Sequence, residues 1–132
     1  MSLITICVPV LNEEENILNT YNAIDEYFKI DLKEYQYEII FTDNNSSDKT
    51  QEIITNLAKD NQKIKYIRFN KNIGYDLSIL EGYRNSSGEA AVVVDCDLQD
   101  PINILKTFID EWKNGHDLIY GVRKKRKENF LF

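Results

Sequence analysis

The sequence predicts an α/β protein whose sheet is mostly parallel, with helices on both faces. Short runs rich in β-branched residues alternate along the chain with segments in which apolar residues recur every three or four positions. No low-complexity linker or internal repeat interrupts this alternation. Such a pattern is typical of parallel sheets crossed by helices, and residues 1–132 fit a single domain.

The β-rich runs predict five strands. They lie at residues 3–10, 37–43, 63–69, 89–97 and 116–123. The first run ends at Pro9, and the third alternates apolar with polar residues, which favours a place near the edge of the sheet. The expected arrangement is Rossmann-like.

Four helices are predicted between these strands. They lie at residues 13–29, 45–60, 72–88 and 101–115. The third helix has Leu77, Leu80 and Tyr83 on one side as its apolar stripe. The fourth has Pro101 at a favoured first-turn position and Gly115 as its C-terminal stop.

The amino-acid composition indicates which binding partners are disfavoured and which cellular compartment is expected. The net charge of −6 argues against a protein held to nucleic acid by phosphate contacts, and residues 123–127 (RKKRK) form the one basic cluster. No apolar run approaches the roughly 20 residues of a membrane helix, and the N-terminus lacks the basic start of a signal peptide. Cys7 and Cys96 indicate no disulfide framework, and His116 alone makes no zinc site, so we expect a reducing, cytoplasmic setting.

Polar clusters follow three of the predicted strands. They are Asn12 with Glu13, Asp43 with Asn44, and Asp95 with Asp97. Ligands of open α/β sheets bind outside the carboxyl ends of the strands, so these clusters are expected to meet at one edge. Each alone has a simpler explanation, such as a turn or a helix cap from Ser47 or Asp48. Their coincidence favours a common site.

Asp95 and Asp97 predict a site for a divalent cation. Residues i and i+2 of an extended segment share a face, and two close anions repel unless a cation lies between them. Mg²⁺ or Mn²⁺ prefers such oxygen ligands, and Gln99 could add a neutral oxygen if the alternation persists. The alternative is a solvated turn in which Asp97 or Asp100 caps the helix near Pro101. The buried strand before the pair and the other clusters favour the cation.

The glycine-rich phosphate loops of other nucleotide-binding proteins are missing from the sequence. No G-x-G-x-x-G follows the first strand, and no G-x-x-x-x-G-K-[ST] occurs anywhere. Phosphates would therefore bind through a carboxylate-held metal, which indicates a metal-dependent enzyme acting on a nucleoside diphosphate. Asp43 comes too early for a helix cap and lies where a base or ribose could form a hydrogen bond.

Four stretches of the chain resemble family 2 glycosyltransferases with the GT-A fold. Residues 8–17 (VPVLNEEENI) look like the opening strand and turn, and residues 42–50 (TDNNSSDKT) resemble the VDDGSTDGT element. Residues 70–101 look like the RNxG…DADLQDPP block, and residues 117–126 (DLIYGVRKKR) look like D(I/V)VYGVRxxR. The D-x-D-L-Q-D-P and Y-G-V-R pieces resemble the polyprenyl-phosphate branch, which includes the relatives of dolichyl-phosphate mannose synthase.

The resemblance implies roles for particular residues. Asp95, Asp97 and Gln99 would form the metal shell. Asp97 and Arg123 would be the catalytic residues, with the Arg123 guanidinium binding phosphate of the donor or acceptor. The residues implied to contact the nucleotide-sugar are Pro9, Asn12, Glu13, Asp43, Asn44 and Asp95.

The chain departs from the family pattern at four positions. Asn44 stands where VDDGS has its second aspartate, and Asn45 replaces the glycine. Lys71 replaces the arginine of RNxG, and Ile102 replaces the second proline of DPP. Asn44 exchanges an acceptor for a mixed donor and acceptor, which bears on the base that is read.

The resemblance also implies the reaction partners. The donor would be a nucleoside-diphosphate sugar, a UDP-sugar in preference to a GDP-sugar, and the acceptor a polyprenyl (undecaprenyl or dolichyl) phosphate. The family's catalytic domain continues for many residues, so residues 1–132 would be one GT-A-like domain truncated at its carboxyl end. The longer protein would be membrane-associated at the cytoplasmic face, and a homo-oligomer remains open.

Two other functions stay open, and a third is disfavoured. The chain could belong to a family 2 enzyme that extends a cell-surface saccharide, or it could be a nucleotide-binding fragment without activity of its own. A phospho-receiver domain is disfavoured because such a domain has its acidic pair after the first strand, whereas here the strongest acidic cluster follows the fourth.

Overall fold

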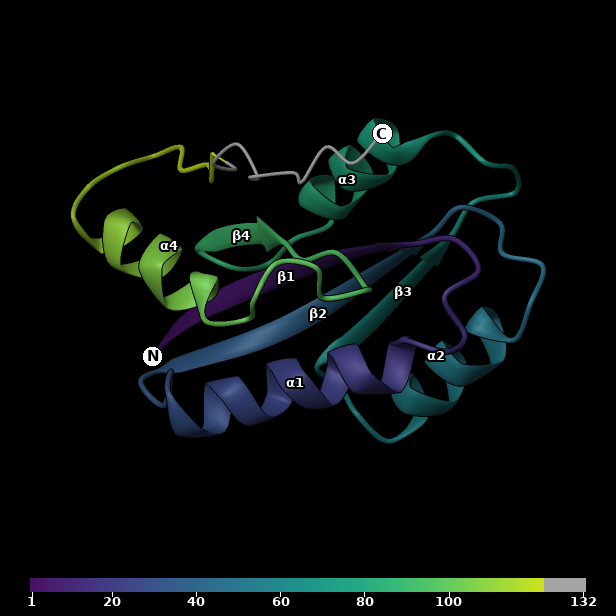
Figure 1. Ribbon diagram of the computed structural model, residues 1–132, viewed down its shortest axis with the longest axis horizontal. Coiled ribbons are helices and arrows are strands. Elements are labelled where there is room, and N and C mark those ends of the chain that lie inside the picture. The colour runs from purple at the N-terminus through teal and green to yellow at the C-terminus, as the bar shows by residue number, and fades with distance from the viewer. Residues whose placement is uncertain (123–132) are drawn as a thin grey trace, which may run out of the picture.

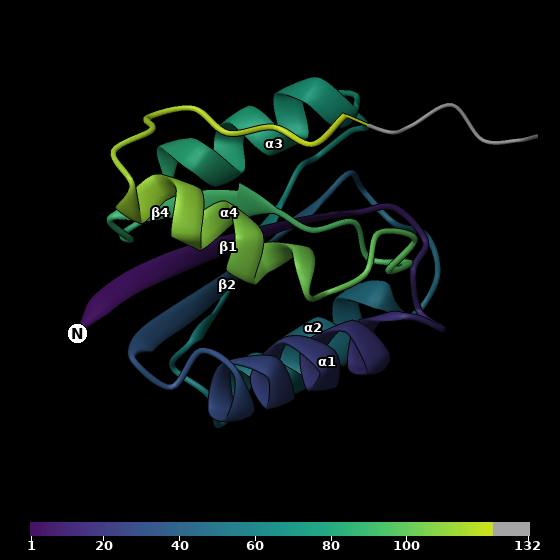
Figure 2. The same ribbon diagram turned by 60° about the vertical axis from the view of Figure 1, so that its left-hand side comes forward.

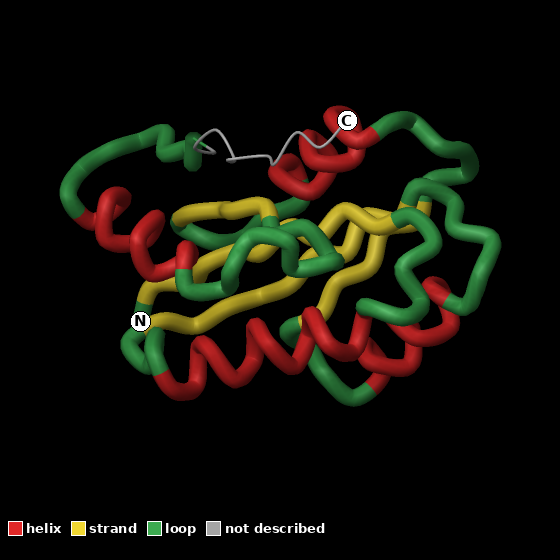
Figure 3. The backbone as a smooth tube through the Cα atoms, viewed as in Figure 1, coloured by secondary structure: helices red, strands yellow, loops and turns green. Residues whose placement is uncertain are grey.

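The computed structural model describes residues 1–122, and these form one parallel sheet with helices on both sides. The elements in chain order are β1 (Ser2–Val10), α1 (Ile17–Ile30), β2 (Tyr35–Asp43), α2 (Thr50–Lys59), β3 (Ile64–Arg68), α3 (Tyr75–Arg84), β4 (Ala90–Val93) and α4 (Ile104–Lys113). The strand order is β3-β2-β1-β4, and every pairing is parallel. The predicted α/β class is confirmed (Figures 1 and 3).

The larger core lies between the sheet and the helices α1 and α2, which run side by side along one face (Figures 1 and 2). Alternate residues of β1, such as Ile4 and Ile6, point to this face, as do Ile39 and Phe41 of β2. The helices contribute their predicted apolar stripes, and α4 adds residues to the same core. The buried helix residues in this cluster are Ile17, Ile24, Phe28, Ile54, Leu105 and Ile109.

Helix α3 covers the opposite face of the sheet through its small residues. Ser78 and Gly82 are buried, and a Cβ atom on Gly82 would lie 3.1 Å from the Cys7 sulfur. The apolar stripe predicted for this helix instead faces outward, because Leu77 is 53% exposed and Leu80 41% exposed. Close approach of the α3 backbone to β1 therefore decides which side of the helix is buried.

A buried carboxylate joins the strands beneath α3 to the loop that precedes β4. Glu38 accepts hydrogen bonds from the Thr5 hydroxyl and the Ser87 backbone amide, each at 2.7 Å. The Lys65 ammonium lies 2.8 Å from the other Glu38 oxygen. Gly88 donates its amide to the Thr5 hydroxyl at 2.9 Å, and a side chain there would collide with the Thr5 backbone nitrogen.

The boundaries of several elements differ from the predictions. The fourth strand, predicted at residues 89–97, ends at Val93, so Asp95 and Asp97 lie in the turn after it and not in an extended strand. Helices α1, α2 and α3 begin three to five residues later than predicted.

The fifth strand, predicted at residues 116–123, is wrong for the part of it that the structure describes: residues 116–122 are not in a strand. A strand needs a neighbour to pair with its backbone, and within residues 1–122 no segment pairs with the outer edge of β4. The last predicted helix begins later than expected, because Pro101 starts a preceding turn by accepting a hydrogen bond from Ile104.

No helix within residues 1–122 is long and apolar enough to cross a bilayer. The two cysteines are buried and unpaired, and burial raises the pKa of each thiol to about 12. Both thiols therefore stay protonated at neutral pH, and neither is an activated nucleophile.

Candidate functional site

A polar cavity of about 420 Å³ opens at the carboxyl ends of β1, β2 and β4. Five of the predicted site residues line it: Pro9, Glu13, Asn44, Asp95 and Asp97. The structure thus brings together residues from the end of β1 and from the segments that follow β1, β2 and β4, which are far apart in the sequence. The remaining lining residues are Val10, Leu11, Asn72, Gly74, Tyr75 and Cys96.

The segment after β4 turns so that Asp95 and Asp97 both line the cavity while the residue between them points into the core. Cys96 is 3% exposed, and its backbone carbonyl accepts a hydrogen bond from the Thr20 hydroxyl of α1. Leu98 has a left-handed backbone (φ 53°) and donates its amide to the Asp95 carbonyl at 3.0 Å. This turn and its link to α1 hold the two carboxylates on one side of the chain.

Each of these carboxylates accepts a hydrogen bond from a described residue. The Tyr75 hydroxyl donates to Asp95 Oδ1 at 2.6 Å, and the Gln99 backbone amide donates to Asp97 Oδ1 at 3.2 Å. Asp97 is exposed, and Asp95 is half-buried. No positively charged side chain of residues 1–122 forms an ion pair with either carboxylate.

The residues of this cavity fit a divalent cation that is shared with a bound ligand. Two carboxylates lining one polar cavity are the hard oxygen donors that Mg²⁺ and Mn²⁺ prefer. Among the described residues no group of three His, Cys, Asp or Glu side chains is placed to hold a metal by itself. Mg²⁺ commonly binds through one or two carboxylates and completes its shell with substrate phosphates and water.

Asn44 connects the end of β2 to the loop before α3. Its Oδ1 accepts the Ile73 amide at 3.1 Å, and its Nδ2 donates to the Gly74 carbonyl at 3.3 Å. Because Oδ1 faces an N–H donor, the amide orientation is determined by the hydrogen bond. Beyond these contacts, Nδ2 of the buried Asn44 side chain keeps one N–H and Oδ1 keeps one lone pair.

Asn12 braces the β1–α1 loop against the β2–α2 loop. Its Oδ1 accepts the amides of Ser47 at 2.8 Å and Asp48 at 3.3 Å, and its own amide donates to the Ser46 hydroxyl at 2.8 Å. Its backbone is left-handed (φ 52°), a conformation that asparagine tolerates better than most residues. Asn12 is not among the residues that line the cavity, and its contact with a nucleotide stays a prediction.

Asp43 is fully buried beneath the cavity. Its Oδ1 accepts the Ser46 amide and hydroxyl at 2.9 and 2.6 Å. Its Oδ2 accepts the Tyr66 hydroxyl at 2.5 Å and the Arg68 guanidinium at 3.0 Å. Burial and the bond to Asp43 raise the pKa of Tyr66 to about 12, so the phenol remains a donor. A direct contact between Asp43 and a nucleotide also stays a prediction.

Besides Asn12 and Asp43, two more predicted residues are not brought into the cavity by the described structure. Gln99 is exposed and is not one of the lining residues, so its place in a metal shell stays a prediction. Arg123 lies outside the described residues. Asn72, Gly74 and Tyr75 line the cavity although the sequence predicted no role for them, and the RNxG-like pattern at residues 71–74 was the signal that could have found them.

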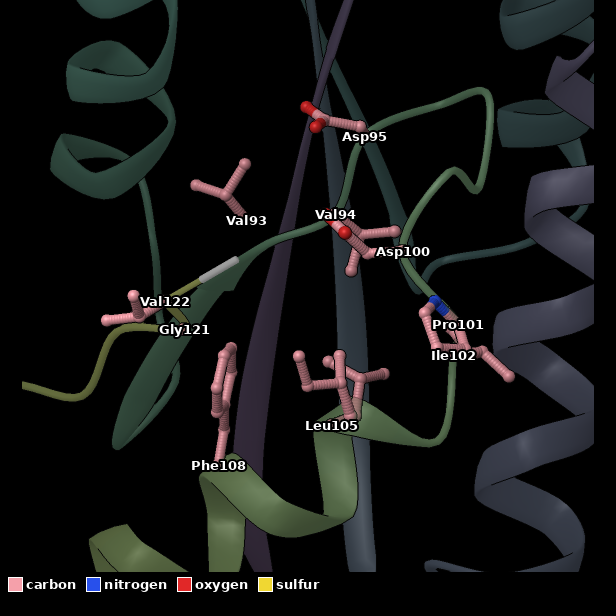
Figure 4. A pocket seen from close by; sticks show the side chains of 11 residues that line it. Val93, Val94, Asp95, Asp100, Pro101, Ile102, Leu105, Phe108, Gly121 and Val122 are labelled. Atoms are coloured by element: carbon pink, nitrogen blue, oxygen red, sulfur yellow. The ribbon is translucent and has the colours of Figure 1, made fainter. Parts of the chain in front are cut away.

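A second cavity of about 370 Å³ lies between β4 and α4 and shares Asp95 with the first. Figure 4 shows Asp95 at one end and Leu105 and Phe108 at the other. Its side chains are apolar apart from the carboxylates of Asp95 and Asp100. This cavity contains only one of the two proposed metal ligands, whereas the polar cavity contains both together with Asn44 and Asn72, so the polar cavity is the better candidate for a nucleotide.

Comparison with known proteins places the chain in a family. The sequence model of glycosyl transferase family 2 matches residues 5–132. The chain belongs to glycosyl transferase family 2. The resemblance inferred from the motifs is thereby confirmed.

Curated relatives in this glycosyltransferase family are longer than the chain. An uncharacterized glycosyltransferase, YkcC, from Bacillus subtilis (strain 168) is 37% identical over 128 residues, which are 97% of this chain and 39% of YkcC. A bactoprenol glucosyl transferase from Shigella phage SfV is 36% identical over 123 residues, 93% of this chain and 39% of that protein. The chain thus spans about two fifths of the length of these relatives.

Solved structures confirm the GT-A-type fold. Staphylococcus aureus TarS 1–349 in complex with UDP matches with a TM-score of 0.63 and 22% identity, over 84% of this chain and 32% of TarS. The mannosyltransferase PcManGT from Pyrobaculum calidifontis, in complex with GDP-Man and Mn²⁺, matches with a TM-score of 0.61 and 22% identity. That match covers 74% of this chain and 32% of PcManGT.

Proposed function

We propose that residues 1–132 bind the donor of a metal-dependent glycosyltransferase, which moves a sugar from a UDP-sugar to a polyprenyl phosphate. The observation that carries the proposal is the polar cavity, where Asp95 and Asp97 meet Pro9, Glu13 and Asn44. Membership of glycosyl transferase family 2 supports sugar transfer. The similarity to a bactoprenol glucosyl transferase supports a lipid-phosphate acceptor.

The chain's own residues bind and orient the donor in this proposal. Asp95 and Asp97 hold Mg²⁺ or Mn²⁺ on the cavity wall, and the turn at Leu98 keeps both carboxylates on that side. A divalent cation bound there offsets negative charge on the diphosphate leaving group. Asn44 lines the cavity beside the two carboxylates and contacts the nucleotide through a remaining amide N–H or lone pair.

The transfer itself is a substitution at the anomeric carbon. A lipid monophosphate is already ionised at neutral pH, so one of its oxygens attacks without a strong general base. The new C–O bond forms as the bond to the diphosphate breaks through an oxocarbenium-like state, and the nucleoside diphosphate leaves with the electron pair. Arg123 is the proposed phosphate-binding cation for this step, because a guanidinium can bind phosphate bidentately.

Calorimetry with UDP tests the donor-binding part of this function. We expect UDP to bind residues 1–132 more tightly with MnCl₂ than with EDTA, and more tightly than GDP does. Asp97→Ala should weaken the Mn²⁺-dependent binding at least about tenfold, because one of the two protein ligands is lost.

Asp110→Ala is the matched control, since it removes an exposed aspartate on α4 far from the cavity lining. It should leave UDP binding unchanged. Metal-independent UDP binding that is insensitive to Asp97→Ala would contradict the proposed metal site.

The acceptor is tested with a protein of the relatives' length. Incubation with radiolabelled UDP-glucose should label undecaprenyl phosphate in detergent micelles and not a soluble saccharide acceptor. Labelling of the saccharide alone would favour the family 2 enzymes that extend a cell-surface saccharide.

A further inference from the structure

Tyr75 reaches across the polar cavity to one of the two proposed metal ligands. It is the first residue of α3, and its hydroxyl donates to Asp95 Oδ1 at 2.6 Å. Both residues line the same cavity. A phenol that donates to an ionised carboxylate forms a charge-assisted hydrogen bond, which is stronger than one between neutral groups.

The start of α3 is held in place by the strand end beside it. Asn44, at the end of β2, binds the backbone of Ile73 and Gly74 on both its amide atoms. Gly74 adopts φ 88°, which glycine adopts without strain, and its amide donates to Asn72 Oδ1 at 2.9 Å. These contacts determine where the next residue, Tyr75, projects.

A second anchor lies one turn into α3. The Ser78 hydroxyl donates to Thr42 Oγ1 of β2 at 2.8 Å, and both residues are fully buried. The helix start therefore cannot shift along the sheet without breaking a buried hydrogen bond. Tyr75 as a whole residue is 51% exposed. Its hydroxyl is nevertheless directed at Asp95 by the anchored start of α3.

The Tyr75 hydroxyl is an uncharged donor to the Asp95 carboxylate. A neutral phenol can occupy one lone pair of the carboxylate without adding a charge that would compete with a cation. The remaining lone pairs of Asp95 are free for a metal.

We propose that Tyr75 is a positioning residue, whose hydroxyl orients the Asp95 carboxylate for a divalent cation shared with a nucleoside diphosphate. This inference rests on the function proposed above. It also gives residues 72–75 a role besides lining the cavity. Asn44 at the end of β2 holds the backbone before Gly74, and Tyr75 holds the proposed metal ligand after β4. Partners that orient ligating carboxylates and histidines commonly change metal affinity or activity 10–100-fold when they are removed.

Tyr75→Phe removes the hydroxyl and keeps the ring. Binding of MnCl₂ is followed by the electron paramagnetic resonance of free Mn²⁺, with and without UDP. We expect Tyr75→Phe to weaken Mn²⁺ binding about tenfold and to change the spectrum of bound Mn²⁺, because the Asp95 carboxylate is no longer held in one orientation. The melting temperature should stay near that of the unaltered chain.

Tyr83→Phe is the matched control. Tyr83 lies on the same helix, and its hydroxyl forms no hydrogen bond within residues 1–122. This variant should bind Mn²⁺ with unchanged affinity and an unchanged spectrum. Asp95→Asn serves as the reference for loss of the ligand itself.

The outcomes separate the positioning role from the proposed function. If Asp95→Asn weakens Mn²⁺ binding but Tyr75→Phe leaves it unchanged or tightens it, the positioning role is overturned and the metal site stands. If the unaltered chain binds no Mn²⁺ with UDP present, both proposals are overturned. A loss in Tyr75→Phe that is matched by Tyr83→Phe would indicate a general effect on α3 and would also overturn the positioning role.

Discussion

Asp43 and Asn44 are neighbours in the sequence and are both buried, but they have different partners. Asp43 is the last residue of β2 and pairs in register with Val10, so its side chain follows Phe41 toward the face that α1 and α2 cover. Asn44 lies one position later, lines the cavity and binds the backbone of the loop before α3. One step along the backbone thus separates an internal acceptor from a residue that borders the cavity.

The Asp43 carboxylate is the acceptor in all four of its hydrogen bonds. This predicts that an amide, which has only one acceptor atom, cannot replace it. Asp43→Asn keeps the shape of the side chain. In either orientation of the new amide, however, its NH₂ group faces hydrogen-bond donors. We expect it to lower the free energy of unfolding by about 2 kcal/mol, measured by urea denaturation, because buried donors lose their acceptor.

Asp110→Asn is the control for this substitution. Asp110 is exposed and pairs with Lys106 on the surface of α4, so its loss should cost less than about 0.5 kcal/mol. Equal effects of Asp43→Asn and Asp110→Asn would show that Asp43 accepts fewer bonds and is free for another partner.

The sequence predicted residues that line the cavity where the signal was local. Asp95 and Asp97 were recognised because carboxylates follow a buried apolar run, and the cavity contains both. Tyr75 and Arg68 were missed because their hydrogen bonds, to Asp95 and Asp43, span 20 and 25 residues. No spacing rule connects residues at such separations.

At the scale of elements, α3 shows how packing can reverse the expectation from apolar spacing. Its leucines and Tyr83 form a regular stripe, yet Ser78 and Gly82 face the sheet. Small residues allow the helix backbone to approach β1, and the Ser78 hydroxyl finds an acceptor in Thr42. The apolar side of α3 is consequently exposed within residues 1–122.

Truncation of leucine or isoleucine on two helices tests this orientation. Leu80→Ala on α3 should cost less than about 1 kcal/mol of unfolding free energy, because Leu80 is 41% exposed. Ile24→Ala on α1 should cost about 2–4 kcal/mol, because Ile24 is fully buried and leaves a cavity. Thermal or urea unfolding of both variants gives the comparison. Similar costs would mean that the outer side of α3 is covered in solution.

The fifth predicted strand illustrates the limit of local composition as a signal. Residues 117–122 are rich in apolar and β-branched residues, but a strand exists only with a partner. β3 and β4 are the edge strands of the sheet, and within residues 1–122 no segment pairs with the outer edge of β4. The local sequence determines whether a segment tends to adopt an extended backbone. An adjacent strand determines whether that segment becomes part of a sheet.

At the scale of the whole molecule, Glu38 links four segments. It connects β1 through Thr5, β3 through Lys65 and the loop before β4 through Ser87. Burial alone would raise the pKa of Glu38. The hydrogen bonds from Lys65, Ser87 and Thr5 outweigh burial and lower the pKa below its ordinary value of 4.5.

The lowered pKa predicts how stability depends on pH. Because the folded state favours ionised Glu38, its contribution is fully present above pH 4.5 and is lost as the pH falls through the lowered folded pKa. The difference in unfolding free energy between the unaltered chain and Glu38→Gln should therefore be constant near neutral pH and shrink below pH 4.5. Urea titrations across this range measure it, and a difference that grows on acidification would contradict the assignment.

The sequence by itself determined the α/β class, four strands and four helices, and the polar clusters at the strand ends. These features depend on periodicity, caps and motifs, which are properties of neighbouring residues. Tertiary structure alone decided that Asp43 is buried, that α3 faces the sheet with Ser78 and Gly82, and that Tyr75 holds Asp95. These outcomes depend on strand register and on loops that meet only after the parallel strands have paired, so no local pattern encodes them.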